Sequence, residues 1–237
     1  MKTAIMQPYL FPYIGYFQLI HAVDQFVLYD DVAYIKNGWI NRNRYLLNGQ
    51  AKYFTLSLGG ASSFKLINET FILENVNHRT KEKALKNLVM AYGKAPFFKP
   101  VYELIKEIIL NPENNIAKYN ENIIRKICNL LNIDTRIITS SNLGKDPALK
   151  SQDKVIDICK RLHTNVYINA IGGKELYAHD DFERNGMQLK FLKPCLEKVT
   201  YHQFEAPFLP GLSIVDILMF NSCQEIRIFL DKYSLED

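Results

Sequence analysis

The sequence predicts an α/β fold with a mostly parallel sheet, and two observations carry this prediction. Short strand patterns alternate with amphipathic helical patterns in both the first and the last third of the chain. The strand pattern at residues 25–29 is a mostly apolar run, which is typical of strands that are covered on both faces in a parallel sheet. With 237 residues, the chain suits one large core, so we expect a single domain over residues 1–237.

The first predicted unit is a strand, a helix and a second strand. Residues 3–7 and 25–29 have strand patterns, and apolar residues three or four positions apart indicate a helix over residues 13–22. The connection between the two strands is long enough for the right-handed crossover that joins parallel strands.

The middle of the chain changes its hydrophobic period. Strand patterns at residues 53–58 and 71–73 are followed by helical periodicity over about residues 79–132, which prolines divide into three stretches. We interpret this block as a helical insertion in the α/β domain.

The alternation of strands and helices resumes after the helical block. Strands are predicted at residues 135–139, 165–169 and 188–192, and helices at residues 151–162, 214–220 and 224–230. Four strand regions are expected to share one sheet: residues 3–7, 25–30, 135–140 and 165–169.

Composition excludes several classes of protein. The chain is 48% hydrophobic and 23% charged with a formal charge of +4, so neither a disordered chain nor a nucleic-acid binder is expected. No apolar run reaches the ~18 to 20 residues of a membrane span. The four cysteines are scattered, and neither they nor the histidines form a short-range metal-ligand pair, so we expect free thiols, no metal and a cytoplasmic location.

The segment MQPYLFPYIGYFQLI, residues 6–20, predicts a rigid ligand-binding loop after the first strand. Its prolines restrict the backbone, and Gln7 lies where open α/β sheets bind ligands, beyond the carboxyl end of a strand. Tyr9 and Tyr13 are candidates for stacking, and Gly15 for close approach of an anion at a helix start. The alternative interpretation is a core-packing corner without a ligand.

The segment YDDVAYIKNGWINRNR follows the second strand and combines carboxylates, cations and amides. Asp30, Asp31 and Lys36 are candidate catalytic residues. Arginine can bind a diphosphate through two parallel hydrogen bonds, and the candidate substrate-binding residues here are Asn41, Arg42 and Asn43. The alternative interpretation is a solvated loop that is stabilised by salt bridges.

Two further loops follow predicted strands. In the first, Ser140, Ser141 and Lys150 could hold a phosphate, although residues from Ser151 on could equally well cap the next helix. In the second, a Gly-Gly pair is a common turn signal, but its position after a strand suggests contacts with a substrate. The candidates in this second loop are Asn169, Gly172, Gly173 and Tyr177.

The segment YHQFEAPFLPGLSIVDILMFN contains His202, which is the candidate general base. An amine that attacks an acyl group must lose a proton, and imidazole is suited to accept it near neutral pH. The alternative interpretation is a core histidine that is held by Asp216 or by a backbone carbonyl. Ser213 is expected to cap the last but one helix, together with Asp216.

Several of these segments, in this order, resemble the WbqC-like protein family. The resemblance covers residues 5 to about 221 and includes QPYLFPYIGYFQLIHAVDQFVLYDDVAYIKNGWINRNR, SSNL, YINAIGGKELY and YHQ followed by PGLSIVDILMFN. It implies a transferase of surface-polysaccharide (O-antigen) synthesis that attaches an acyl or amino-acyl group to a nucleotide-linked amino sugar. The implied acyl donor is a thioester on an acyl or peptidyl carrier protein, without a further cofactor.

A more distant likeness suggests a Rossmann-like fold and a second function. In nucleotidyl transferases and pantoate ligases, a His-x-Gly-His turn after the first strand contacts ATP. Tyr13-Ile14-Gly15-Tyr16 has a similar place, but tyrosine cannot supply a cation at neutral pH. An ATP-dependent ligase or nucleotidyl transferase is therefore an alternative, and a non-catalytic nucleotide-sugar-binding protein is another.

Overall fold

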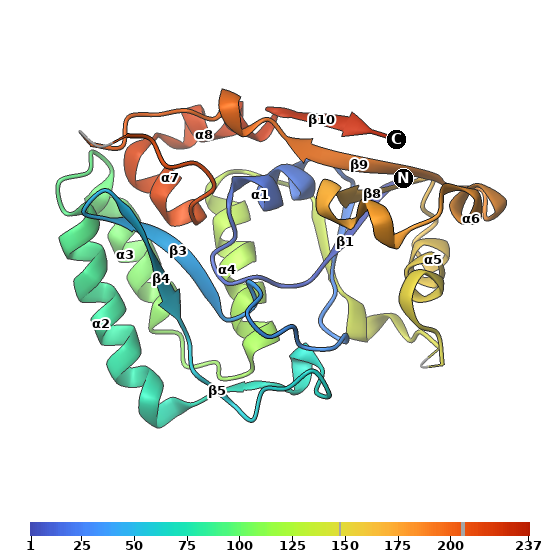
Figure 1. Ribbon diagram of the computed structural model, residues 1–237, viewed down its shortest axis with the longest axis horizontal. Helices are drawn as coiled ribbons and strands as arrows, with labels where there is room; N and C mark the ends of the chain where they lie inside the picture. The colour runs from blue at the N-terminus through green and yellow to red at the C-terminus, as the bar shows by residue number, and fades with distance from the viewer. Residues whose placement is uncertain (147, 205–206) are drawn as a thin grey trace.

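A six-stranded sheet forms the centre of the protein, in a computed structural model that describes residues 1–146, 148–204 and 207–237 (Figure 1). The strand order is β10-β9-β8-β1-β2-β7, and every neighbouring pair is parallel except β9 and β10. The strands are β1 (Lys2–Met6), β2 (Gln25–Leu28), β7 (Arg136–Thr139), β8 (Val166–Ala170), β9 (Gln188–Pro194) and β10 (Tyr233–Glu236). The α/β class and the mostly parallel sheet are as the sequence predicts.

The four strands that were expected to share one sheet do so, as β1, β2, β7 and β8, with bounds that differ by one or two residues. From β1 the chain passes to β2 and β7 on one side, and then returns to β8 and β9 on the other side of β1. The strand order therefore reverses between β1 and β8. In open α/β sheets, a crevice for ligands forms at the carboxyl ends of the strands beside such a reversal.

Helices cover both faces of the sheet because successive side chains of a strand point to opposite faces. Ala4, Phe26 and Leu28 belong to one core cluster, whereas Ile5 and Val27 belong to a second. The first cluster includes residues of α1 (Ile14–His21) and α4 (Ile116–Leu130), and the second includes residues of α5 (Ser151–Arg161) and α6 (His179–Arg184).

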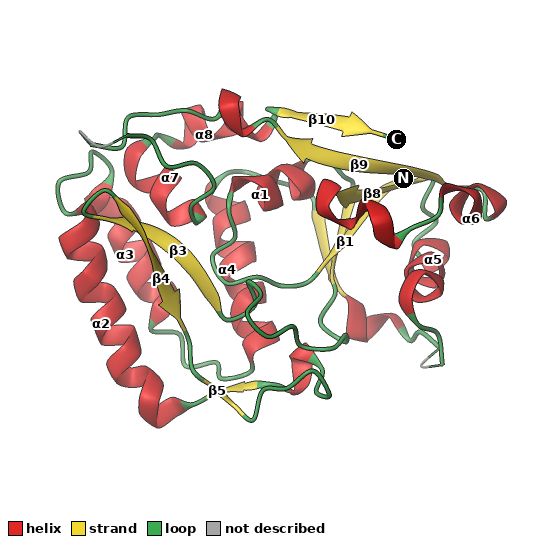
Figure 2. Ribbon diagram, viewed as in Figure 1, coloured by secondary structure: helices red, strands yellow, loops and turns green. Residues whose placement is uncertain are grey.

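The block predicted as helical contains α2 (Glu74–Tyr92), α3 (Phe98–Ile109) and α4. Figure 2 shows α2 beside a small hairpin at one end of the molecule and α5 and α6 at the other end, with the six-stranded sheet between them. Residues of α4 share the core cluster of α1 and β2, so the last helix of the block contributes to the main core. The interpretation of the block as an insertion stays a prediction.

The hairpin corrects two predictions from the sequence. It consists of β3 (Arg42–Leu47) and β4 (Gln50–Thr55), so the predicted strand at residues 53–58 begins and ends earlier. The substrate-binding candidates Arg42 and Asn43 lie in β3 rather than in a loop. Asn48 and Gly49 form the turn, both with positive φ, and this Asn-Gly pair is a strong hairpin signal in the sequence.

The remaining elements are short. They include β5 (Leu58–Gly59), β6 (Phe71–Ile72), α7 (Ile214–Phe220), α8 (Cys223–Leu230) and the 3-10 helices η1 (Ile67–Glu69), η2 (Ser140–Leu143), η3 (Ile171–Leu176) and η4 (Leu196–Lys198). Ser213 caps α7 as expected, since its side chain accepts the N–H of Val215. Ser151 is the first residue of α5 rather than its cap, because Lys150 holds the N-cap position.

Candidate functional site at the carboxyl edge of the sheet

A polar cavity of about 350 Å³ lies at the carboxyl ends of β1, β2 and β7. Pro8, Asp30 and Ser141 line it and follow β1, β2 and β7, respectively. The first turns of α4 and the η1 segment close the other side. The remaining lining residues are Leu28, Asn68, Asn115, Ala117, Lys118, Glu121, Thr139 and Asn142. We call this space the edge cavity.

Asp30 connects β2 to β7 at the wall of the edge cavity. Its side chain is buried, and Oδ1 accepts the backbone N–H of Ser141 at 2.9 Å. Oδ2 accepts the Ser141 hydroxyl at 2.7 Å and the Asn68 amide at 3.3 Å. A carboxylate has about four lone-pair positions, so Asp30 can accept one further hydrogen bond. Asn68 Oδ1 is buried and has no hydrogen-bond partner in the described part of the chain.

The charges of the edge cavity favour a donor-rich ligand. Asp30 and Glu121 contribute carboxylates, and Lys118 contributes the cation. The N-terminus of α4 offers few free amides to a phosphate, because the Asn115 side chain accepts the N–H groups of Ala117 and Lys118. The cavity is therefore suited to hydroxyl and ammonium groups rather than to a bare anion.

Asp31 forms an ion cluster with two lysines. The Nζ atoms of Lys145 and Lys154 lie 2.5 Å and 3.3 Å from Asp31 Oδ2. Lys145 Nζ also donates to the carbonyl and hydroxyl oxygens of Ser140, and Lys154 Nζ donates to the Asp31 carbonyl at 2.8 Å. Asp31 Oδ1 is buried and lacks a hydrogen-bond partner among the described residues. This cluster ties the end of β2 to η2 and α5.

The ion cluster shifts the pKa values of its members. Burial would raise the pKa of Asp31, but hydrogen bonds from Lys145 and Ser140 and the charges of Lys145 and Lys154 hold the pKa below its usual value. Burial lowers the pKa of Lys145, although Asp31 offsets part of this effect. Lys145 and Lys154 were not among the residues predicted from the sequence. A pair of acidic residues directly after a buried strand was the available signal, because such charges need cations nearby.

Comparison with known proteins identifies the family. Residues 7–228 match the model of the WbqC-like protein family. The chain belongs to this family. This WbqC-like protein is also 26% identical over 231 residues to the uncharacterized protein Rv1507c of Mycobacterium tuberculosis, with 97% of each chain covered. No solved structure matches it.

Neither a metal-binding cluster nor a membrane-spanning helix is found in the described part of this WbqC-like protein. Within residues 1–146, 148–204 and 207–237, no group of three or more His, Cys, Asp or Glu side chains is arranged to hold a metal ion. No helix in this described part combines the length and the apolar character that crossing a membrane requires.

The opening loop, residues 7–13, is rigid because buried side chains bind its carbonyl groups. The amide of Asn43 donates to the carbonyls of Leu10 and Phe11 at 2.9 Å and 2.8 Å. The amide of Asn120 donates to the Pro8 carbonyl at 2.9 Å. The sequence suggested that Asn43 binds substrate. In the structure, its amide is buried and donates to two carbonyls of the opening loop.

The aromatic residues of the opening loop pack mainly on their own neighbours. The rings of Tyr9 and Tyr16 are 5.6 Å apart, and the Tyr16 hydroxyl donates to the Gln7 carbonyl at 2.9 Å. A Cβ atom on Gly15 would lie 2.5 Å from atoms of the Tyr13 ring. The ring of Tyr13 thus takes the space over Gly15 that the sequence assigned to an anion.

The side chains of the candidates Asn41 and Arg42 form hydrogen bonds with neighbouring segments of the protein. The Asn41 amide donates to the Leu56 carbonyl at 2.8 Å, and its oxygen accepts the Tyr34 hydroxyl at 2.8 Å. The Arg42 guanidinium donates to the carbonyls of Asn37 and Gly38 and lies over the Tyr53 ring. Lys36 is exposed. This segment resembles the stabilised loop of the alternative interpretation more than a diphosphate clamp.

The segment after β8 contributes no residue to the described lining of the edge cavity. A Cβ atom on Gly173 would lie 2.7 Å from the Asn169 amide nitrogen, whereas Gly172 has open space around it. The Tyr177 hydroxyl lies 3.4 Å from that of Tyr167. Proximity to Asp31 and Tyr177 contributes to the raised pKa of Tyr29, although burial is the main cause. Lys150 is exposed at the start of α5.

His202 lies apart from the edge cavity and the ion cluster. It is exposed, in a loop whose neighbouring residues pack beside α7 and α8. Asp216 does not bind His202. Its carboxylate accepts from Tyr201, Gln203 and Tyr92 at 2.5, 2.6 and 2.8 Å. Burial raises the pKa of Asp216. The structure thus brings Asp30 and Asp31 together with Ser140 and Ser141, but not with His202, whose catalytic role stays a prediction.

Proposed function

We propose that this WbqC-like protein is a transferase that attaches an acyl or amino-acyl group to the amine of a nucleotide-linked amino sugar. One observation supports this substrate class: the edge cavity presents acceptors to its ligand. Asp30 has unused acceptor capacity, and the buried oxygen of Asn68 has no partner among the described residues, whereas the Glu121 carboxylate already accepts from Arg125 and Thr139. An amino sugar offers several hydroxyl donors and an ammonium group, which match these acceptors.

The strand order of the sheet supports a Rossmann-like fold, and this fold is suited to the nucleotide part of the proposed substrate. Dinucleotide-binding sheets share the strand order of β7-β2-β1-β8-β9, in which the order reverses beside the first strand. The edge cavity lies at the carboxyl ends of three of these strands, where such sheets bind their ligands. Lys118 is the cation of the cavity lining and is the candidate partner for a phosphate.

In the proposed reaction, Asp30 binds the ammonium group and accepts one proton from it. The neutral amine attacks the acyl carbon of a thioester donor. A C–N bond forms, the C–S bond breaks, and the leaving thiolate takes up a proton. A carboxylate can act as such a base when it lies within hydrogen-bond reach of the amine. The ion cluster of Asp31, Lys145 and Lys154 positions Asp30, because it fixes the preceding strand end to η2 and α5.

The implied setting is the synthesis of surface-polysaccharide precursors in the cytoplasm, with the donor on a carrier protein. The test is to incubate purified protein with UDP-linked and dTDP-linked amino sugars and acyl thioesters, and to detect the mass of the added group. The matched hydroxy sugars should not react. Asp30→Asn should reduce turnover by about 10²-fold or more. Asp134→Asn, at an exposed position, is the matched control and should leave turnover unchanged.

Other outcomes would support other functions. Tight binding of the nucleotide sugar without transfer from any donor would indicate a binding protein. Formation of AMP or diphosphate from ATP would indicate a ligase or nucleotidyl transferase. Equal turnover of Asp30→Asn and the unmodified protein would contradict the assignment of Asp30 as the base.

A further inference from the structure

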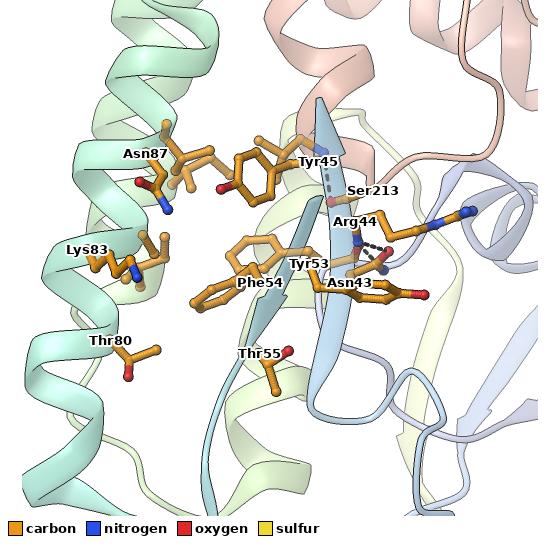
Figure 3. Close-up of a pocket in the computed structure, with 16 residues that line it drawn as sticks. Asn43, Arg44, Tyr45, Tyr53, Phe54, Thr55, Thr80, Lys83, Asn87 and Ser213 are labelled. Atoms are coloured by element: carbon orange, nitrogen blue, oxygen red, sulfur yellow. Dashed lines mark hydrogen bonds between the residues drawn. The ribbon is translucent and has the colours of Figure 1, made fainter. Parts of the chain in front are cut away.

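A second cavity, of about 290 Å³, lies between the β3–β4 hairpin and the helices α2 and α3 (Figure 3). It is separate from the edge cavity and has a different lining, because most of its inner surface is apolar. The apolar side chains are those of Phe11, Phe54, Leu88, Ile105, Ile109 and Val215. We call this space the hairpin pocket.

The polar groups of the hairpin pocket are concentrated at its rim. Figure 3 shows Thr80, Lys83 and Asn87 on the side of α2 that faces Tyr45 and Phe54 of the hairpin. No lining residue in the described part of the chain is acidic. Arg44 also lines the pocket, but its guanidinium donates to the Gly211 carbonyl at 3.2 Å and points away from α2. The ammonium of Lys83 is therefore the cation that is available to a ligand at the rim.

The volume of the hairpin pocket limits the size of its ligand. Small-molecule sites usually measure about 300–1,000 Å³, so this pocket is at the small end of the range. At about 30 Å³ for each water-sized group, it holds roughly ten non-hydrogen atoms. A medium-chain or aromatic acid fits this volume.

We propose that the hairpin pocket binds a small apolar monocarboxylate. Its hydrocarbon part packs on Phe54, Ile105 and Ile109, and its carboxylate lies at the rim near Lys83 and Asn87. Burial of the hydrocarbon supplies most of the affinity, because removing apolar surface from water is favourable. The positive charge selects the carboxylate over a neutral head group. This site is independent of the transferase proposal, because it shares none of its lining residues with the edge cavity.

The test uses octanoate as the probe and octanol as its neutral match. Isothermal titration should show octanoate binding at one site and weaker binding of octanol. Lys83→Gln should weaken octanoate binding by about fivefold, as expected for a partly exposed charge pair, and should leave octanol binding unchanged. Lys86→Gln is the matched control, because Lys86 is an exposed lysine of the same helix that does not line the pocket.

Localisation is tested separately in the unmodified protein. With isoleucine methyl groups labelled for NMR, octanoate should shift the signals of Ile105 and Ile109 and leave those of Ile156 and Ile158 in α5 unchanged. Ala84→Leu should abolish binding, because Ala84 lines the pocket and a larger side chain fills it.

Three results would overturn the proposal. They are the absence of octanoate binding, equal weakening by Lys83→Gln and Lys86→Gln, and methyl shifts that avoid Ile105 and Ile109. The NMR result applies even if Ala84→Leu fails to fold.

Discussion

The segments that follow β1 and β2 differ in what their polar groups bind. In the opening loop after β1, Asn43 and Asn120 bind the carbonyls of Pro8, Leu10 and Phe11. After β2, Asp30 and Asp31 bind side chains of other segments and retain unused acceptor capacity, including a buried carboxylate oxygen without a partner in the described residues. The carbonyls of the first segment are bound by the protein itself, whereas the carboxylates of the second segment can accept further hydrogen bonds.

This difference shows that rigidity and binding capacity are separate properties. Prolines and aromatic residues made the opening loop look like the main ligand-binding segment, but buried side chains of the protein bind its carbonyl groups. Each of these carbonyls faces a buried amide donor of the protein, so it is directed into the fold rather than toward an external ligand. A segment with unpaired buried groups is the stronger candidate, because such groups are costly unless something satisfies them.

The largest expected effect is that of Asn43→Ala. Two buried carbonyls of the opening loop would lose their donor, so the free energy of unfolding should fall by about 4 kcal/mol. Urea denaturation measures this loss. Asn41→Ala is the control, because Asn41 makes two side-chain hydrogen bonds but is half-buried, and this substitution should cost about 1 kcal/mol. If the two variants lose the same free energy of unfolding, the buried hydrogen bonds of Asn43 do not stabilise the protein more than those of Asn41.

Asp31→Asn should have the next largest effect. It leaves two partly buried lysines without their carboxylate, which should lower the free energy of unfolding by about 3 kcal/mol at neutral pH. Adding Lys154→Met should recover part of this loss, since one of the uncompensated charges is then removed. A double variant that is less stable than Asp31→Asn alone would mean that Lys154 acts through packing instead.

The pH dependence sharpens the role of Asp31. Its pKa in the folded protein is below its usual value, so its stabilisation is present above the unfolded pKa and is lost as the pH falls through the folded pKa. The stability difference between the unmodified protein and Asp31→Asn should therefore stay constant on acidification from pH 7 to near the ordinary carboxyl pKa of 3.8, and should shrink as the pH falls further. Denaturation at a series of pH values measures this, with Asp134→Asn as a control that should show little change. A difference that grows on acidification would contradict the lowered pKa.

The smallest expected effect on stability is that of His202→Ala. This exposed residue should contribute no more than about 0.5 kcal/mol to the free energy of unfolding. If Asp30 is the base, turnover in the transferase assay should also remain. A loss of turnover by roughly two to four orders of magnitude would instead support the base that was predicted from the sequence.

The sheet could be predicted from the sequence because its strands are short apolar runs with helices between them. β1, β2, β7 and β8 were found in this way, and so was α7 with its Ser213 cap. The β3–β4 hairpin was missed although its Asn-Gly turn is visible. The charged and amide residues of β3 had been interpreted as ligand-binding groups instead of strand residues.

The site was less predictable than the fold, because its contacts connect distant segments. That two strand ends carry polar residues could be seen in the sequence, and this located Asp30, Asp31, Ser140 and Ser141. Which face each carboxylate occupies depends on the register of β2. Lys145 follows η2 and meets Asp31 only in the folded chain. Likewise, no local pattern indicates that Tyr92, Tyr201 and Gln203 bind Asp216.

The central position of β1 has a consequence for synthesis in the cell. β1 pairs with β2 on one side and with β8 on the other, yet β8 begins only at Val166. At about 5–20 residues per second, a ribosome completes β8 roughly 10 to 30 s after β1. During that interval one edge of β1 has no strand to pair with, and an unpaired apolar strand edge promotes aggregation. A nascent chain that stalls before β8 should therefore depend on chaperones, even though the finished protein buries that edge.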